Sequence, residues 1–125
     1  VLTLATHLYF DLAYNKHPGE RGLSWAGYVD AEKPFQLVPM DYYRSTREDR
    51  FGSPLDPAVF NGKERLTESG RENVVGIQAN LWSETLGSTG RLEYMLLPKL
   101  FGLAERAWAP EPAWAQNSDA ATASE

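Results

Sequence analysis

Two tripeptides in this chain place a carboxylate two residues after an aromatic ring. They are Tyr9-Phe10-Asp11 and Trp82-Ser83-Glu84, and each one ends an apolar run. Residues two apart in a strand point to the same face, so each tripeptide would present its ring and its acid together. A carboxylate that accepts hydrogen bonds from hydroxyls, beside a ring that covers C–H groups, is suited to holding a sugar. Either tripeptide alone is also typical of an ordinary strand end, but two copies favour a binding site.

The segments around these tripeptides predict the elements that position them. Residues 2–9 and 73–82 are predicted to be buried strands, and the nearly continuous apolar character of the second is typical of a parallel strand. Residues 12–34 predict a long irregular loop that carries aromatics, with a short helix beginning near Pro39. Residues 46–72 are charged and rich in turn formers, which predicts a surface excursion of low order.

The strongest helical pattern follows the second tripeptide. Apolar residues recur at i, i+3 and i+4 from Leu92 to Ala107, which predicts an amphipathic helix with Ser88 or Thr89 as its N-cap. Pro98 is expected to kink or split this helix, because proline lacks the N–H that an interior helical residue donates.

This order of elements predicts an α/β fold built from two consecutive βα units, with a parallel sheet flanked by helices. Both tripeptides then lie at the carboxyl ends of strands, where active sites lie in TIM barrels and in open doubly wound sheets alike. Two units cannot close a barrel, which needs about 250 residues. Because the sequence also opens directly on an apolar run without an initiator methionine, we expect the chain to be part of something longer.

Composition excludes several classes of partner and site. The net charge of −5 and the scattered basic residues argue against nucleic-acid binding. No apolar stretch approaches the roughly 20 residues of a membrane span. The chain has no cysteine, which excludes disulfides and thiolate metal sites within it. His7 and His17 lack metal-site spacing, so we expect no metal or other cofactor, and we expect His7 to be a hydrogen-bonded core residue.

Four blocks of this sequence closely resemble the C-terminal part of the family 20 glycoside hydrolases, the β-N-acetylhexosaminidases. They are residues 8–12, 22–28, 76–84 and 98–108, and they occur in the family's order. The resemblance implies that residues 1–109 are the seventh and eighth βα units of a TIM (β/α)8 barrel. Residues 110–125 are small and polar and are expected to form a disordered tail.

The resemblance also implies an activity and a role for each site residue. Family members remove terminal N-acetylhexosamine from glycans or chitooligosaccharides with retention, and the substrate's own 2-acetamido oxygen attacks the anomeric carbon. Tyr9 matches a catalytic tyrosine that hydrogen-bonds the acetamido group. Asp11 and Glu84 match acids that accept hydrogen bonds from the outer hydroxyls of the sugar. Trp82 matches an aromatic of the −1 pocket, and Trp25 matches a tryptophan on its rim.

One part of the family's machinery is absent from this sequence. The general acid is a glutamate preceded by an aspartate, and no Asp-Glu pair occurs here. We therefore expect these 125 residues alone to be inactive, with the activity residing in a parent protein that supplies the remainder of the barrel. The resemblance favours an exported parent, whether periplasmic, extracellular or lysosomal.

Two alternatives stay open at this stage. One is a non-catalytic sugar-binding module that keeps the aromatic pocket without the acid. The other is a two-carboxylate glycosidase that uses Asp11 and Glu84 as its catalytic pair.

Overall fold

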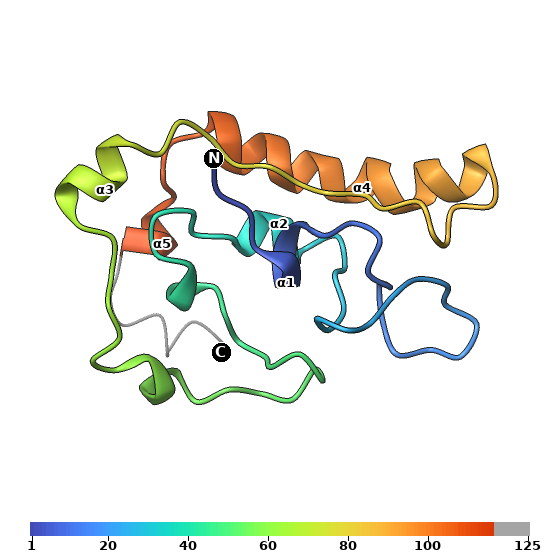
Figure 1. The fold of residues 1–125 in the computed structure, drawn as a ribbon, viewed down its shortest axis with the longest axis horizontal. Coiled ribbons are helices and arrows are strands. Elements are labelled where there is room, and N and C mark those ends of the chain that lie inside the picture. Colours follow the sequence, from blue (N-terminus) through green and yellow to red (C-terminus); the bar gives the residue numbers. More distant parts are fainter. Residues whose placement is uncertain (117–125) are drawn as a thin grey trace.

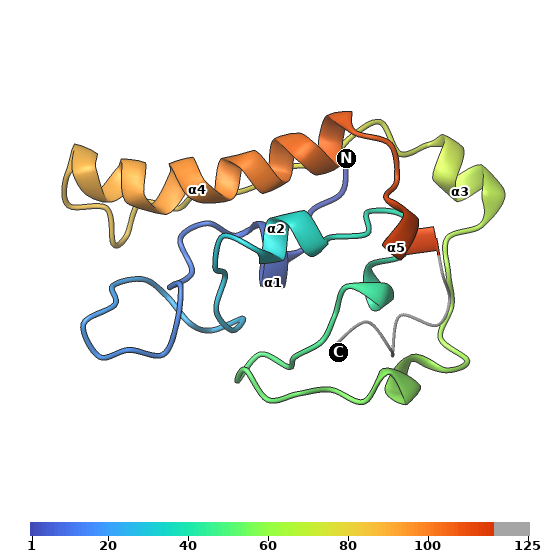
Figure 2. The ribbon, with the colours of Figure 1, turned by 180° about the vertical axis from the view of Figure 1, so that it is seen from behind.

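The computed structural model describes residues 1–116 (Figure 1). One long helix, α4, runs along one side of the molecule, and the short helices α1 and α2 lie beside it. Figure 2 shows the same arrangement from behind, with the extended segment that precedes α4 running along the helix in both views. In chain order the helices are α1 (Ala5–Leu8), α2 (Lys33–Gln36), η1 (Tyr42–Arg44), η2 (Pro57–Phe60), α3 (Glu68–Glu72), α4 (Thr89–Trp108) and α5 (Ala113–Gln116).

The two segments predicted as strands pair in parallel, but only through isolated bridges. Leu2 pairs with Ile77, and Tyr9 pairs with Asn80. The parallel orientation is confirmed, whereas neither residues 2–9 nor residues 73–82 form the continuous strand that was predicted. Tyr9 lies seven positions after Leu2, whereas Asn80 lies only three positions after Ile77, so the first segment has four more residues between the two bridges than the second. The four residues of α1 form a helical turn that takes up this excess.

Helix α4 forms where the sequence predicts it. The Ser88 side chain caps its first turn by accepting a hydrogen bond from the backbone N–H of Arg91 at 3.2 Å. Pro98 lies inside the helix, yet the 20 residues continue as a single α-helix, so the prediction of a split is wrong. Proline leaves the carbonyl four residues earlier, that of Tyr94, without its helical donor. The hydroxyl of Tyr14 donates to this carbonyl at 2.7 Å and replaces the missing bond.

Helix α2 was not predicted, and it lies at the end of the segment expected to be an irregular loop. It packs against α4 at Gly102, where a Cβ would lie only 2.6 Å from Cβ of Pro34. The absence of a side chain at Gly102 therefore lets the two helices approach closely. The short helix expected near Pro39 begins later, as the 3₁₀ turn η1.

The core lies between the first segment, the following loop and α4. Its buried residues are Leu8, Phe10, Leu12, Ala26, Val29 and Leu37. Residues 46–72 lie at the surface with the short helices η2 and α3, and most of their side chains are exposed or half-buried.

The tail departs from its prediction in the part that the structure describes. Residues 113–116 form α5, and Ala115 is buried. Residues 117–125, also predicted to be disordered, lie outside the described residues. None of the helices in residues 1–116 is both long and apolar enough to cross a membrane.

Candidate functional site

Tyr9 and Trp25 form an aromatic corner at the carboxyl end of the first segment. Tyr9 follows α1 directly, and the backbone N–H of Phe10 donates to the carbonyl of Asn80 at 2.7 Å. The rings of Tyr9 and Trp25 meet edge to face, with centroids 5.6 Å apart and an interplanar angle of 77°. Trp25 remains 55% exposed, so the corner keeps an open apolar face.

A tight backbone contact brings Trp25 to this corner. The loop that carries it returns to the first segment, where Leu12 and Leu23 form a parallel bridge. Gly22 allows the approach, because its φ is +151° and a Cβ there would lie 2.7 Å from the backbone nitrogen of Ala13.

A polar cluster ties the same loop to the start of α4. Glu20 accepts a hydrogen bond and ion pair from Arg91 at 3.2 Å and a hydrogen bond from the Tyr94 hydroxyl at 3.0 Å. The loop is therefore anchored at Glu20 and at Leu23, before Trp25, and the backbone N–H of Val29 donates to the carbonyl of Ala13 at 3.0 Å after it.

Asp11 is almost completely buried, and one of its carboxylate oxygens has no partner within the described chain. Oδ1 accepts a long hydrogen bond from the backbone N–H of Trp82 at 3.5 Å, whereas Oδ2 accepts none from residues 1–116. Burial raises the pKa of Asp11, and the nearby Glu84 carboxylate raises it further. A buried oxygen without a donor is suited to accept a hydrogen bond from a ligand hydroxyl.

The second tripeptide lies beside the first through this contact. Trp82 is 54% exposed and Glu84 is exposed, so both side chains are accessible from solvent. The structure thus joins Tyr9 to Trp25 and Asp11 to Trp82. It brings Glu84 close enough for its carboxylate to raise the pKa of Asp11, although Glu84 forms no hydrogen bond or ion pair with residues 1–116.

Lys99 is a residue that the sequence-based prediction missed. Its side chain is completely buried, and its ammonium donates to the carbonyls of Phe10 and Leu12, each at 2.9 Å. The ring of Tyr14 covers the ammonium at 4.1 Å. Burial lowers the pKa of Lys99 to about 7, and the attraction of the nearby Asp11 carboxylate offsets only part of that effect. The available signal was its spacing, because Met95, Lys99 and Gly102 are the buried positions of α4.

His7 is a buried structural residue, as predicted. Its Nε2 donates to the carbonyl of Ser45 at 3.1 Å, and its Nδ1 accepts from the hydroxyl of Thr6 at 2.9 Å. Burial lowers its pKa to about 4, so the ring is neutral near pH 7. Within residues 1–116, no group of three or more His, Asp or Glu side chains is arranged to hold a metal ion.

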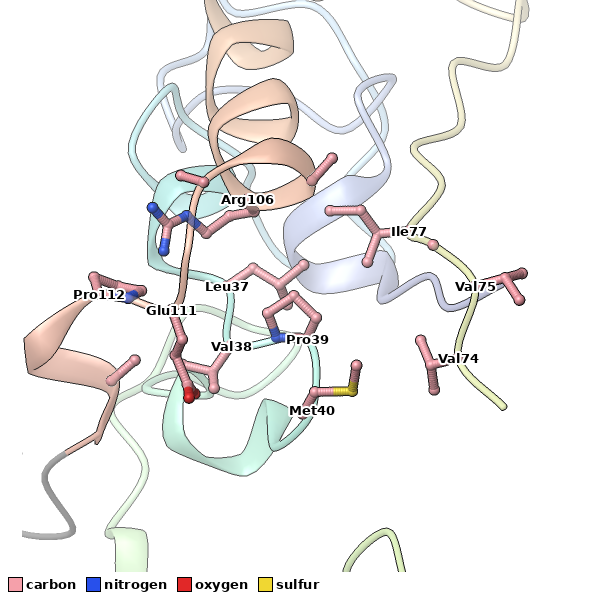
Figure 3. Close-up of a pocket in the computed structure, with 14 residues that line it drawn as sticks. Leu37, Val38, Pro39, Met40, Val74, Val75, Ile77, Arg106, Glu111 and Pro112 are labelled. Carbon is pink, nitrogen blue, oxygen red and sulfur yellow. The ribbon is translucent and has the colours of Figure 1, made fainter. Parts of the chain in front are cut away.

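A separate pocket lies at the other end of the paired segments. It has a volume of about 320 Å³ and contains none of the five predicted site residues. Figure 3 shows that it opens between Val74–Ile77, the segment that includes Leu37 and Pro39, and the end of α4 at Arg106. The parallel segments start here and run toward the aromatic corner, so the pocket marks their amino end. In barrel folds this end serves stability rather than catalysis.

The fold and site define a piece of a parallel α/β protein with aromatic rings and carboxylates at the carboxyl ends of its segments. Residues 1–111 match the family described as "Glycosyl hydrolase family 20, catalytic domain". The chain belongs to glycoside hydrolase family 20. Its arrangement fits part of the TIM barrel of these enzymes.

Individual relatives agree with this assignment. The chain is 34% identical over 115 residues to beta-hexosaminidase B of Pseudoalteromonas piscicida, which covers 86% of this chain and 14% of the relative. It is 34% identical over 105 residues to N,N'-diacetylchitobiase of Vibrio harveyi, and this match covers 82% of this chain and 11% of the relative. A mutant beta-hexosaminidase of Streptomyces plicatus, solved in complex with its product GlcNAc, is 34% identical with a TM-score of 0.57. This match covers 87% of this chain and 17% of the solved chain. The chain therefore spans less than a fifth of the length of these relatives.

Proposed function

We propose that this chain is the seventh and eighth βα units of a (β/α)8 barrel, and that the full-length protein is a β-N-acetylhexosaminidase. Its substrates are glycans or chitooligosaccharides with a terminal N-acetylhexosamine. The observation that carries this proposal is the convergence of Tyr9, Asp11 and Trp82 at the carboxyl ends of two parallel segments. Active sites of barrels are built at this end.

The exposed apolar surface of α4 supports the need for the rest of a barrel. Leu97 is 47% exposed, Phe101 is 68% exposed and Trp108 is 89% exposed. Large apolar side chains gathered on one helix are normally covered by a neighbouring element. In the proposed parent, the remaining six βα units cover this surface and pair with the open edges of the two segments.

The chemistry of each site residue fits substrate-assisted hydrolysis with retention. The Tyr9 hydroxyl donates to the 2-acetamido group and steadies it while its oxygen attacks the anomeric carbon, so no enzyme carboxylate serves as nucleophile. Trp82 covers the apolar face of the sugar. Trp25 lies at the rim and supports the Tyr9 ring through their edge contact.

The two acids act as hydrogen-bond acceptors. Asp11 and Glu84 accept hydrogen bonds from the outer hydroxyls of the terminal sugar, which are strong because the acceptors are ionised. The buried Oδ2 of Asp11, which has no donor among residues 1–116, favours this role.

The general acid must come from outside these 125 residues. Protonation of the leaving oxygen by a positioned acid contributes typically 10²–10⁴-fold. We therefore expect the isolated chain to be inactive and the barrel to supply the acid from an upstream strand.

Two other functions are compatible with a sugar pocket of this kind. A non-catalytic module would bind the sugar without cleaving it. A two-carboxylate glycosidase would use Asp11 and Glu84 directly, but Asp11 is only 1% exposed and one of its oxygens already faces the N–H of Trp82.

Hydrolysis of a chromogenic N-acetyl-β-glucosaminide by the full-length protein tests the proposal. Tyr9→Phe should mainly lower kcat, by roughly 10²–10³-fold, as expected for loss of a hydrogen bond made in the transition state. Glu84→Gln should mainly weaken substrate binding, by on the order of 10-fold, because the acceptor loses its charge. A full-length protein that binds the sugar without cleaving it would instead support the binding module.

A further inference from the structure

The backbone around Asp11 is held from two sides. On one side, the carbonyl of Asp11 accepts a hydrogen bond from the N–H of Leu23 at 3.1 Å. On the other side, the carbonyls of its two neighbours, Phe10 and Leu12, both point to Nζ of Lys99 at 2.9 Å.

The ammonium of Lys99 occupies a place where a paired strand would supply backbone donors. The last backbone–backbone hydrogen bonds between the two segments run from the Asn80 N–H to the Leu8 carbonyl at 2.9 Å and from the Phe10 N–H to the Asn80 carbonyl at 2.7 Å. Beyond this point, no backbone N–H of residues 1–116 donates to the carbonyls of Phe10 or Leu12. A buried carbonyl without a donor is costly, so Lys99 satisfies two such groups at once.

Lys99 is well suited to fix a position. Its side chain is fully buried, and the Tyr14 ring packs over its ammonium at 4.1 Å. It comes from α4, the longest and most regular element of the described chain. A neutral amine retains two hydrogens, so both carbonyl bonds persist in either protonation state.

We propose that Lys99 is a positioning residue for Asp11. By holding the carbonyls on both sides of Asp11, it fixes the direction in which the Asp11 carboxylate meets an outer hydroxyl of the sugar. This inference rests on the proposed function, in which Asp11 accepts that hydroxyl. Displacement of a binding group by about 1 Å costs on the order of 10²-fold in rate.

The test compares selectivity rather than total activity in the full-length protein. The substrates are a chromogenic N-acetyl-β-glucosaminide and its analogues that each lack one outer hydroxyl. The ratio of their kcat/KM values does not depend on the fraction of folded enzyme, so a loss of stability alone leaves it unchanged. Asp11→Asn identifies the hydroxyl that Asp11 binds, because the preference for substrates carrying that hydroxyl should fall.

Lys99→Met is the decisive variant, because methionine keeps much of the volume and removes both donors. We expect it to lower the preference for the Asp11-dependent hydroxyl by roughly 10-fold or more, while the preferences for the other hydroxyls persist. Met95→Ala, at another buried position of α4, serves as the control for destabilisation and should retain every preference.

Each result bears on the proposal. A Lys99→Met enzyme with the wild-type preference overturns it. If Lys99→Met gives no active protein, Lys99→Arg takes its place, because the larger guanidinium must shift the two carbonyls. A changed preference for the Asp11-dependent hydroxyl in Lys99→Arg supports the proposal, and an unchanged preference overturns it. If the full-length protein hydrolyses no substrate, the proposed function itself is refuted. If the enzyme is active but Asp11→Asn changes no hydroxyl preference, the role of Asp11 is refuted, and the role of Lys99 with it.

Discussion

The hydroxyl of Tyr14 donates a 2.7 Å hydrogen bond to the carbonyl of Tyr94, the one carbonyl in α4 that Pro98 deprives of its helical donor. This bond joins the loop after the first tripeptide to the N-terminal part of the longest helix. The same Tyr14 ring covers the ammonium of Lys99. One side chain therefore completes the helix and shields the lysine beneath Asp11.

Tyr14→Phe should destabilise the full-length protein by about 1 kcal/mol, because it removes this hydrogen bond and keeps the ring. Thermal denaturation measures the effect. A double-mutant cycle with Pro98→Ala tests whether this hydrogen bond replaces the missing helical one, since alanine restores an N–H donor to the Tyr94 carbonyl. The cost of Tyr14→Phe should shrink in the Pro98→Ala background, and an equal cost in both backgrounds would contradict this account.

Gly22→Ala should disrupt the aromatic corner. A Cβ at Gly22 meets backbone atoms of Ala13 at 2.7 and 2.8 Å, and the φ of +151° is unfavourable for alanine. We expect a loss of stability of about 2 kcal/mol or more and weaker substrate binding, because the loop that carries Trp25 is displaced. Gly90→Ala is the matched control, since apart from its own turn of α4 nothing in the described chain lies within 4 Å of its Cβ position. Equal melting temperatures for the two variants would refute the prediction.

His7 should make stability depend on pH in the acidic range. Burial lowers its folded pKa to about 4 from an ordinary value of 6.5, so the unfolded chain binds a proton that the folded chain excludes. The stability is therefore fully present above pH 6.5 and decreases as the pH falls toward 4. Lowering the pKa from 6.5 to about 4 corresponds to about 3 kcal/mol of stability that is lost at acidic pH.

His7→Gln tests this directly, because glutamine keeps a donor for the Ser45 carbonyl but does not titrate. Melting temperatures of the two proteins are compared between pH 4 and 8. The wild type should lose more stability on acidification than the variant, and parallel curves would show that His7 does not titrate in this way.

The sequence predicted the features that depend on local pattern. The apolar runs around Tyr9 and Trp82 indicated parallel segments, and the bridges Leu2–Ile77 and Tyr9–Asn80 have that orientation. The cap at Ser88 and the extent of α4 also follow from neighbouring residues. The proximity of Asp11 to Trp82 follows from the parallel pairing, since it places both tripeptides at the same end.

The sequence could not predict features that depend on distant partners. Residues 5–8 have no helical periodicity, and α1 arises because the two paired segments differ in length. Pro98 normally interrupts a helix, and the distant Tyr14 compensates for the bond that it removes. Lys99 belongs to a residue type that is seldom buried, and its burial depends on two free carbonyls 87 and 89 residues earlier in the chain.

The comparison that tests the central claim most directly is hydrolysis of two chromogenic substrates by the full-length protein. One is the N-acetyl-β-glucosaminide, and the other is the β-glucoside that lacks the 2-acetamido group. We predict rapid hydrolysis of the first and almost none of the second, because the nucleophile belongs to the substrate. Comparable hydrolysis of both would contradict substrate assistance and favour catalysis by a pair of enzyme carboxylates.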